Sequence, residues 1–176
     1  MTIRLNGSTS GYVEIDAPAV AGAGMLTFPT GVGTLLTAEG GKVLQVVTGT
    51  TSTAISTTST SYITTGLTAT ITPSRASSKI LILTSMNTEK TTDNIFSGIV
   101  SAVFRGTVSG TVLQEGVFYA PGNVPTGQTS LLVLDSPNTT SAQTYTVGFK
   151  TNSGLTTVTA ARGGNLATIT LMEISA

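Results

Sequence analysis

Apolar and polar residues alternate with a period of two along most of this chain, which is the pattern of β-strands with one buried face. The alternation is clearest after residue 42, where short alternating runs are separated by clusters of Gly, Pro, Asn and Ser. No stretch of ten or more residues shows a convincing helical period. The pattern therefore predicts an all-β protein.

The expected strands differ in how many of their faces are apolar. Residues 143–150 place Tyr145, Val147 and Phe149 on one face and small or polar residues on the other. Residues 79–86 are apolar on both faces, which is typical of a central strand. The full set of expected strands is 42–48, 62–71, 79–86, 99–105, 111–119, 129–135, 143–150, 155–160 and 166–174.

Most segments between these strands contain turn-forming residues; the exception is the Thr/Ser-rich segment 48–60. Gly106 to Gly110 predicts a hairpin turn, and residues 121–127 predict a Gly/Pro loop. Residues 48–60 are almost entirely Thr and Ser, so they fit a low-complexity linker, a polar edge strand or a long loop, with Ile55 as an apolar anchor. Strands at this spacing indicate an antiparallel β-sandwich, jelly-roll-like, over residues 42–176.

The first 41 residues differ in composition from the rest of the chain. They are rich in Gly and Ala, and their apolar pieces are too short to build a core that offsets the cost of ordering the backbone. Such a segment is either disordered or buries its apolar residues against other chains. The alternation over residues 12–16 favours an ordered strand with one dry face, so we expect an extended N-terminal β-arm, residues 1–41, for intertwining and attachment. Its candidate interface residues are Ile3, Leu5, Tyr12, Val13, Ile15, Met25, Leu26, Phe28, Leu35 and Leu36.

Composition narrows the classes of function. Threonine makes up about a fifth of the chain, and there is no His, Cys or Trp. Catalysis near neutral pH usually recruits His or Cys, so the sequence predicts a non-enzymatic protein. Without Cys it has neither disulfides nor thiolate metal sites. Only 9% of residues are charged and the net charge is zero. The four Arg and four Lys are scattered, which argues against nucleic-acid binding and against docking on anionic membranes.

A few polar groups merit a chemical interpretation. Glu14 and Asp16 fall on one face of an expected strand, where they form a solvated surface, pair with Arg4 of another chain, or act as paired carboxylates. Glu89, Asp93 and Asn94 form the other acidic cluster, without the spacing of an EF-hand calcium site. The glycine pairs at 22–24 and 31–33 lack the strand and helix of a dinucleotide-binding loop. We therefore expect no catalytic, cofactor or metal residues.

The sequence contains no targeting or membrane signal. The first residues lack the cationic and apolar regions of a signal peptide, and the longest apolar run, residues 80–83, is far shorter than a membrane span. We therefore expect no membrane insertion.

Two long stretches and the C-terminus resemble known proteins. The segment IRLNGSTSGYVEIDAPAVAGAGMLTFPTG (3–31) resembles segments of tail-fibre and virion proteins of phages, notably those of cyanobacteria. The segment GKVLQVVTGTTSTAISTTSTSYITTGLTATITPSRASSKILI (41–82) is similar to a module of the same group, and ATITLMEISA (167–176) to its closing strand. The resemblance implies a virion structural protein, usually homotrimeric and without a cofactor, assembled in the host cytoplasm.

The resemblance leaves two placements open. Fibres of this group often carry an upstream tail-attachment domain, whereas this chain begins at Met1 close to the shared segment. This favours a capsid decoration (cement) protein, whose partners are copies of itself and the major capsid protein. The alternative is a tail-fibre or receptor-binding module attached to a tail component. It would recognise a host surface glycan through residues 87–97 and 119–129, with Tyr119 exposed.

Overall fold

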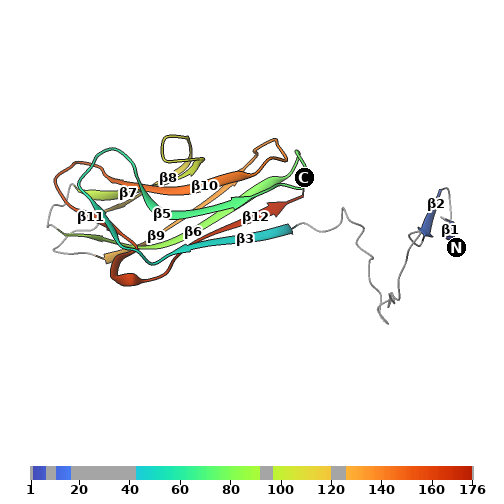
Figure 1. The fold of residues 1–176 in the computed structure, drawn as a ribbon, viewed down its shortest axis with the longest axis horizontal. Coiled ribbons are helices and arrows are strands. Elements are labelled where there is room, and N and C mark those ends of the chain that lie inside the picture. The colour runs from blue at the N-terminus through green and yellow to red at the C-terminus, as the bar shows by residue number, and fades with distance from the viewer. Residues whose placement is uncertain (1, 7–10, 17–42, 92–96, 120–125, 176) are drawn as a thin grey trace. The chain divides into compact units, whose positions relative to one another are not determined.

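The computed structural model describes residues 2–6, 11–16, 43–91, 97–119 and 126–175 (Figure 1). The chain divides into two compact units, Met1–Leu35 and Leu36–Ala176, which are taken one at a time below.

The first unit contains a short antiparallel ladder. Strand β1 (Thr2–Asn6) pairs with β2 (Tyr12–Asp16), so the alternating strand predicted over residues 12–16 is present. The register sets Ile3 opposite Ile15 and Leu5 opposite Val13, while Arg4 lies opposite Glu14. Arg4 Nε donates a hydrogen bond of 2.8 Å to Glu14 Oε1, so the ion pair forms within one chain.

The second unit is built from strands and one short 3₁₀ helix, η1 (Arg162–Gly164). Its strands are β3 (Val43–Thr51), β4 (Ile55–Thr57), β5 (Ile63–Ile71), β6 (Lys79–Lys90), β7 (Gly98–Arg105), β8 (Thr111–Tyr119), β9 (Thr126–Asp135), β10 (Gln143–Thr151), β11 (Val158–Ala160) and β12 (Ala167–Ile174).

These strands form two antiparallel sheets that lie one above the other (Figure 1). One sheet has the order β5-β10-β7-β8. In the other, β3 pairs with β12 and β12 with β6, while β9 pairs along the opposite edge of β6. The short strands β11 and β4 extend this sheet, because β11 pairs with β6 beyond the end of β12 and β4 pairs with β11. The second sheet therefore has four main positions: β3, β12, β6 and β9.

The strand pairs are nested along the sequence of this unit, so that each pair encloses the next. With β4 counted as the continuation of β3 and β11 as part of β12, the first strand pairs with the last, β3 with β12. Inside it, β5 pairs with β10, β6 with β9, and β7 with β8. An eight-position hairpin wound into two sheets in this way is a jelly roll. The predicted antiparallel, jelly-roll-like β-sandwich is confirmed.

The core lies between the two sheets. As predicted, Tyr145, Val147 and Phe149 point inward along β10, where each is at most 1% exposed. They pack in one cluster with inward residues of both sheets, among them Leu67, Ile71, Ile80, Ile82, Met86, Val103, Ile169 and Leu171.

Two polar clusters are buried within this sandwich. Asp135 of β9 accepts hydrogen bonds from Arg105 Nε of β7 at 2.8 Å and from the Tyr145 hydroxyl of β10 at 2.7 Å, so it joins the two sheets. Glu173 of β12 is 0% exposed and accepts bonds from Gln45 Nε2 at 2.6 Å and from both the backbone N–H and the hydroxyl of Ser74 at 2.7 Å.

The structure refines several strand boundaries. Strand β6 continues to Lys90 rather than residue 86, because inward polar groups there have partners: Thr88 Oγ1 donates to Gly127 O and Lys90 Nζ to Ser97 O, both at 3.3 Å. The Thr/Ser-rich segment takes the edge-strand form, since β3 runs to Thr51 and Ile55 of β4 packs against the core. Strand β11 begins at Val158 rather than residue 155.

The outer face of the β5-β10-β7-β8 sheet is partly covered by a side chain of the same chain. Tyr62 lies edge-on to Phe104 with ring centroids 5.0 Å apart, and its hydroxyl bonds Glu115 of β8. Lys150 Nζ sits 4.3 Å from the centre of the Tyr62 ring. The described part of the chain contains no helix with the length and apolar character of a membrane span.

Candidate interaction surface

The outer face of the β3-β12-β6-β9 sheet carries an apolar patch. One row of directly paired residues crosses all four strands: Val46, Met172, Leu81 and Leu134. Residues of one row share a face because side chains alternate along each strand. Val46 is 55% exposed and Leu134 is 51% exposed, so the row faces away from the core.

A second row extends the patch along the strands. Thr48 pairs with Thr170, Thr170 with Leu83, and Leu83 with Leu132, which is 63% exposed. Beyond the first row, Val43 pairs with Ile174 at the end of the sheet. We call this set the outer apolar patch: Val43, Val46, Leu81, Leu83, Leu132, Leu134, Met172 and Ile174.

Strand β6 explains why the patch exists. Its inward residues Ile80 and Ile82 are fully buried, and its outward residues Leu81 and Leu83 are equally apolar. A strand that is apolar on both faces is typical of a sheet covered on both sides. Monomeric soluble proteins rarely leave a contiguous apolar patch open, and larger patches mark interaction sites.

The middle of the same face is polar but uncharged. The third row consists of Thr50, Thr168, Ser85 and Ser130. A shallow groove of about 370 Å³ runs between the leucines and these hydroxyls, lined by Leu83, Thr84, Ser85, Ser130, Leu131, Leu132, Thr168 and Thr170. None of the residues in the three rows carries a charge. The surface can therefore bind by apolar packing and hydroxyl hydrogen bonds, without an electrostatic term.

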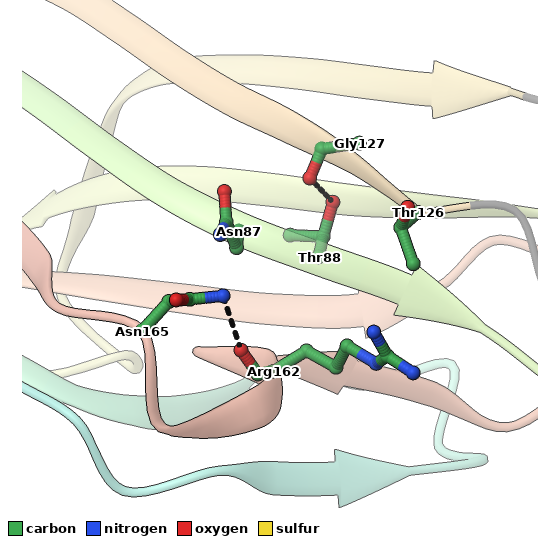
Figure 2. A pocket seen from close by; sticks show the side chains of 6 residues that line it. All are labelled: Asn87, Thr88, Thr126, Gly127, Arg162 and Asn165. Atoms are coloured by element: carbon green, nitrogen blue, oxygen red, sulfur yellow. Dashed lines mark hydrogen bonds between the residues drawn. The ribbon is translucent and has the colours of Figure 1, made fainter.

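The far end of this sheet holds a polar pocket of about 240 Å³, shown in Figure 2. Asn165 Nδ2 donates to Arg162 O at 3.2 Å, which fixes the turn at η1 beside β6 and β9. The Arg162 guanidinium forms an ion pair with the largely buried carboxylate of Glu89. The pocket is lined by Asn87, Thr88, Thr126, Gly127, Arg162 and Asn165, a set suited to hydroxyl-rich or anionic ligands.

The pocket is lined in part by described residues of the two predicted recognition loops: Asn87, Thr88, Thr126 and Gly127. Residues 87–90 and 126–129 are strand ends rather than loops, and Thr126 pairs with Glu89. Tyr119 is 55% exposed, as expected, and its hydroxyl accepts a 3.0 Å hydrogen bond from Asn152 Nδ2. The segments 92–96 and 120–125 lie outside the described residues. Val43, where the chain enters the sandwich, is at the opposite end.

Five of the ten predicted interface residues lie in described strands. Strands β1 and β2 contain Ile3, Leu5, Tyr12, Val13 and Ile15. The remaining candidates, Met25, Leu26, Phe28, Leu35 and Leu36, lie outside the described residues.

Two of the acidic candidates form ion pairs with arginines of the same chain. Glu14 pairs with Arg4 and Glu89 with Arg162, while Asp93 and Asn94 lie outside the described residues. Across the described ranges, no group of three or more Asp or Glu side chains is placed to hold a metal ion.

The outer apolar patch was not predicted from the sequence, although its signal was present. The strand over residues 79–86 was recognised as apolar on both faces, and Leu131 to Leu134 is a second such run. Two neighbouring strands of this kind require a second covered face, but their pairing became visible only with the sheet order.

No protein-family model matches this chain, and no curated protein sequence matches it. Among solved structures it is similar to a mutant VP2 protein of infectious bursal disease virus in T=1 particles, with a TM-score of 0.42, 13% identity, and coverage of 97% of this chain and 44% of that one. A chain in the structure of the Gx strain of that virus gives a TM-score of 0.43, 14% identity, and coverage of 94% of this chain and 43% of that one. This chain thus spans less than half the length of those virus proteins.

A third similar structure is that of Bacillus endospore appendages, which form disulfide-linked pili. The TM-score is 0.31 at 16% identity, covering 80% of this chain and 98% of that one. The jelly-roll assignment itself rests on the strand pairing of this chain.

Proposed function

We propose that this chain is a non-enzymatic structural protein of a phage virion, a homotrimeric capsid decoration (cement) protein. Its N-terminal arm binds the capsid surface, and its sandwich projects from the shell. The role is mechanical, because the bound arms bridge neighbouring capsid subunits against the internal pressure of packaged DNA.

The observation that carries the proposal is the register of β1 and β2. Ile3 is paired with Ile15 and Leu5 with Val13, so the register brings four apolar residues together in a two-stranded ladder. An isolated two-stranded ladder is marginally stable in water and needs a surface to pack against. A neighbouring subunit or a capsid protein supplies that surface in the proposed assembly.

The sandwich adds support of a different kind. It is stabilised by packing without disulfides, its charge is low, and its outer apolar patch suits a crowded assembly better than dilute solution.

The test compares the full chain with a variant lacking residues 1–35. Both proteins are mixed with particles that lack this protein, and binding is read by co-sedimentation. The proposal predicts that the full chain binds, that the truncated chain does not, and that the truncated chain keeps its β-sheet circular dichroism. Binding that is equal for both proteins would contradict attachment through the arm, and a dimeric or monomeric full chain would contradict the trimer.

A second function is favoured by one observation, the polar pocket beside η1 (Figure 2). In that alternative the chain is a tail-fibre or receptor-binding module, and Asn87, Arg162 and Asn165 hydrogen-bond the hydroxyl or acidic groups of a host surface glycan. Glycan arrays probed with the full chain and with an Asn87→Ala variant test it. The control is Ser141→Ala, an exposed residue of the turn at the opposite end of the sandwich. Absence of glycan binding at high avidity would remove this alternative.

A further inference from the structure

We propose that the outer apolar patch packs against the same patch of a second copy of this chain, sheet face against sheet face. The contact involves the sandwich alone, so it is separate from the association through the N-terminal arm and does not depend on where the protein is placed in a virion.

The face has the area that a stable contact between copies requires. Strand β6 has 12 residues, which at about 3.3 Å per residue make a face about 40 Å long. Four strand positions about 4.8 Å apart give a width of about 19 Å. The whole sheet face, with β11 and β4 included, therefore has a flat area of about 750 Å², close to the roughly 800 Å² per partner of a standard interface. The part where β3, β12, β6 and β9 are all paired, Lys79 to Ser85 on β6, covers about 440 Å² of it.

The chemistry of the face is complementary to itself. In a two-fold contact each surface meets its own copy, so a charge close to the axis would face a like charge. The three rows that cross the sheet between Leu81 and Ser85 contain only leucine, methionine, valine, threonine and serine. Hydroxyl pairs already join strands elsewhere in the sandwich, as between Thr70 and Thr144 at 2.8 Å. The same pairing can join two copies.

The charged groups of this face lie at its two ends. Lys79 is beside Ile174 at one end, and Glu89 is covered by Arg162 at the other. A two-fold axis that lies between the two faces and crosses the strands at Leu83 sets Leu83 and Leu132 of one copy opposite the same residues of the other, and the Leu81 row opposite the Ser85 row. It places Lys79 of each copy toward Asn87 of the other, away from the other Lys79. Aligned sheets pack about 10 Å apart in this manner.

The decisive variant is Leu132→Glu in the full chain. Leu132 is 63% exposed on the edge strand β9, in the row of Leu83 that meets its own copy, so a carboxylate there leaves the core intact and places two like charges in the contact. We expect self-association to weaken by roughly 100-fold and the mass from light scattering at a fixed concentration to halve. Leu155→Glu is the matched control, because Leu155 is 65% exposed in the turn before β11. Its mass should equal that of the unaltered chain.

A chemical cross-linking experiment tests the same contact independently. The chain has no cysteine, so a single introduced thiol reports one position. A short bifunctional thiol reagent should link two copies of the Leu83→Cys variant and leave Val117→Cys, on the outer face of the other sheet, unlinked.

Either of two results would overturn the contact: a Leu132→Glu chain whose mass and concentration dependence match the unaltered chain, or Leu83→Cys linked no faster than Val117→Cys. Neither result affects the particle-binding test of the arm. The reverse outcome is also distinguishable. If the unaltered chain does not bind particles, but its mass in solution is halved by the Leu132→Glu substitution, the proposed function is refuted and this contact is supported.

Discussion

Arg105 and Asp135 form a two-point ion pair across the sandwich, in which both guanidinium nitrogens Nε and Nη2 donate to the carboxylate of the facing sheet. Asp135 is 5% exposed, and its side chain raises the pKa of Arg105 through the hydrogen bonds it accepts. The pair ties β7 to β9 at the end of the sandwich where the β7-β8 turn lies.

Removing one partner of this pair should destabilise the sandwich strongly. In Arg105→Met the buried carboxylate loses its counter-charge, which costs on the order of 3 kcal/mol of unfolding free energy. Urea unfolding followed by circular dichroism measures it. Arg4→Met removes an exposed pair in the other unit and should leave the sandwich transition unchanged. A loss below about 1 kcal/mol in Arg105→Met would mean that the pair is structurally dispensable.

Glu173 should make stability depend on acidic pH. Burial alone would raise the pKa of its carboxyl, but the hydrogen bonds from Gln45 and Ser74 outweigh burial and lower the pKa from 4.5 to about 2. Because the folded-state pKa lies below the unfolded one, the group contributes about 3 kcal/mol above pH 4.5, and this contribution is lost as the pH falls toward 2. Melting temperatures from pH 6 to pH 2 should fall steeply. In Glu173→Gln the curve should be flatter and lower near neutral pH, and an equally steep fall would assign the effect to other groups.

Tyr145 should make folding stability depend on alkaline pH. Burial and its hydrogen bond to Asp135 raise the pKa of the phenol above the ordinary value of 10, and burial raises that of Tyr62 in the same direction. A neutral phenol held in the folded state stabilises it up to about pH 10, and this stability is lost as the pH rises further. Tyr145→Phe should lower stability at pH 7 by about 1–2 kcal/mol and reduce the alkaline loss. Unfolding measured from pH 7 to pH 11 checks both parts, and an unchanged alkaline slope would contradict the assignment to Tyr145.

Gly49 should not tolerate a side chain. A Cβ added there would lie 2.0 Å from the backbone oxygen of Thr68, so β3 and β5 could not approach each other as they do. Gly49→Ala should cost about 3 kcal/mol, at the upper end of overpacking effects. Thr50→Ala, at the next and exposed position, should change stability by less than about 0.5 kcal/mol. Denaturant midpoints of the two variants give the comparison, and equal midpoints would contradict a close approach of the two strands.

Local patterns were sufficient to predict the strands and the sandwich. Period-two alternation in residues 143–150 sorted Tyr145, Val147 and Phe149 correctly to the core, and the hairpin around Gly106 to Gly110 lies where the turn residues placed it. These features are encoded within about ten residues, which is the range over which periodicity carries information.

Features that depend on distant pairing were not accessible in the same way. The contact of Arg105 with Asp135 and the bond between Gln45 and Glu173 join residues far apart along the chain. The outer apolar patch depends on the order β3-β12-β6-β9, which no local run specifies. The sequence predicts a loop over residues 87–97, whereas residues 87–90 continue β6, where Thr88 and Lys90 have hydrogen-bond partners within the sandwich.

The nested pairing of the jelly roll also sets an order in which this chain can fold during synthesis. Strands β7 and β8 are neighbours in sequence and can pair early. Strand β3 can pair with β12 only after β12 has been synthesised. Contacts of such high sequence separation make folding slow. Because the outer apolar patch includes Met172 and Ile174 of β12, its complete surface arises only once β12 has left the ribosome, and a chain that ends before β12 lacks the complete face.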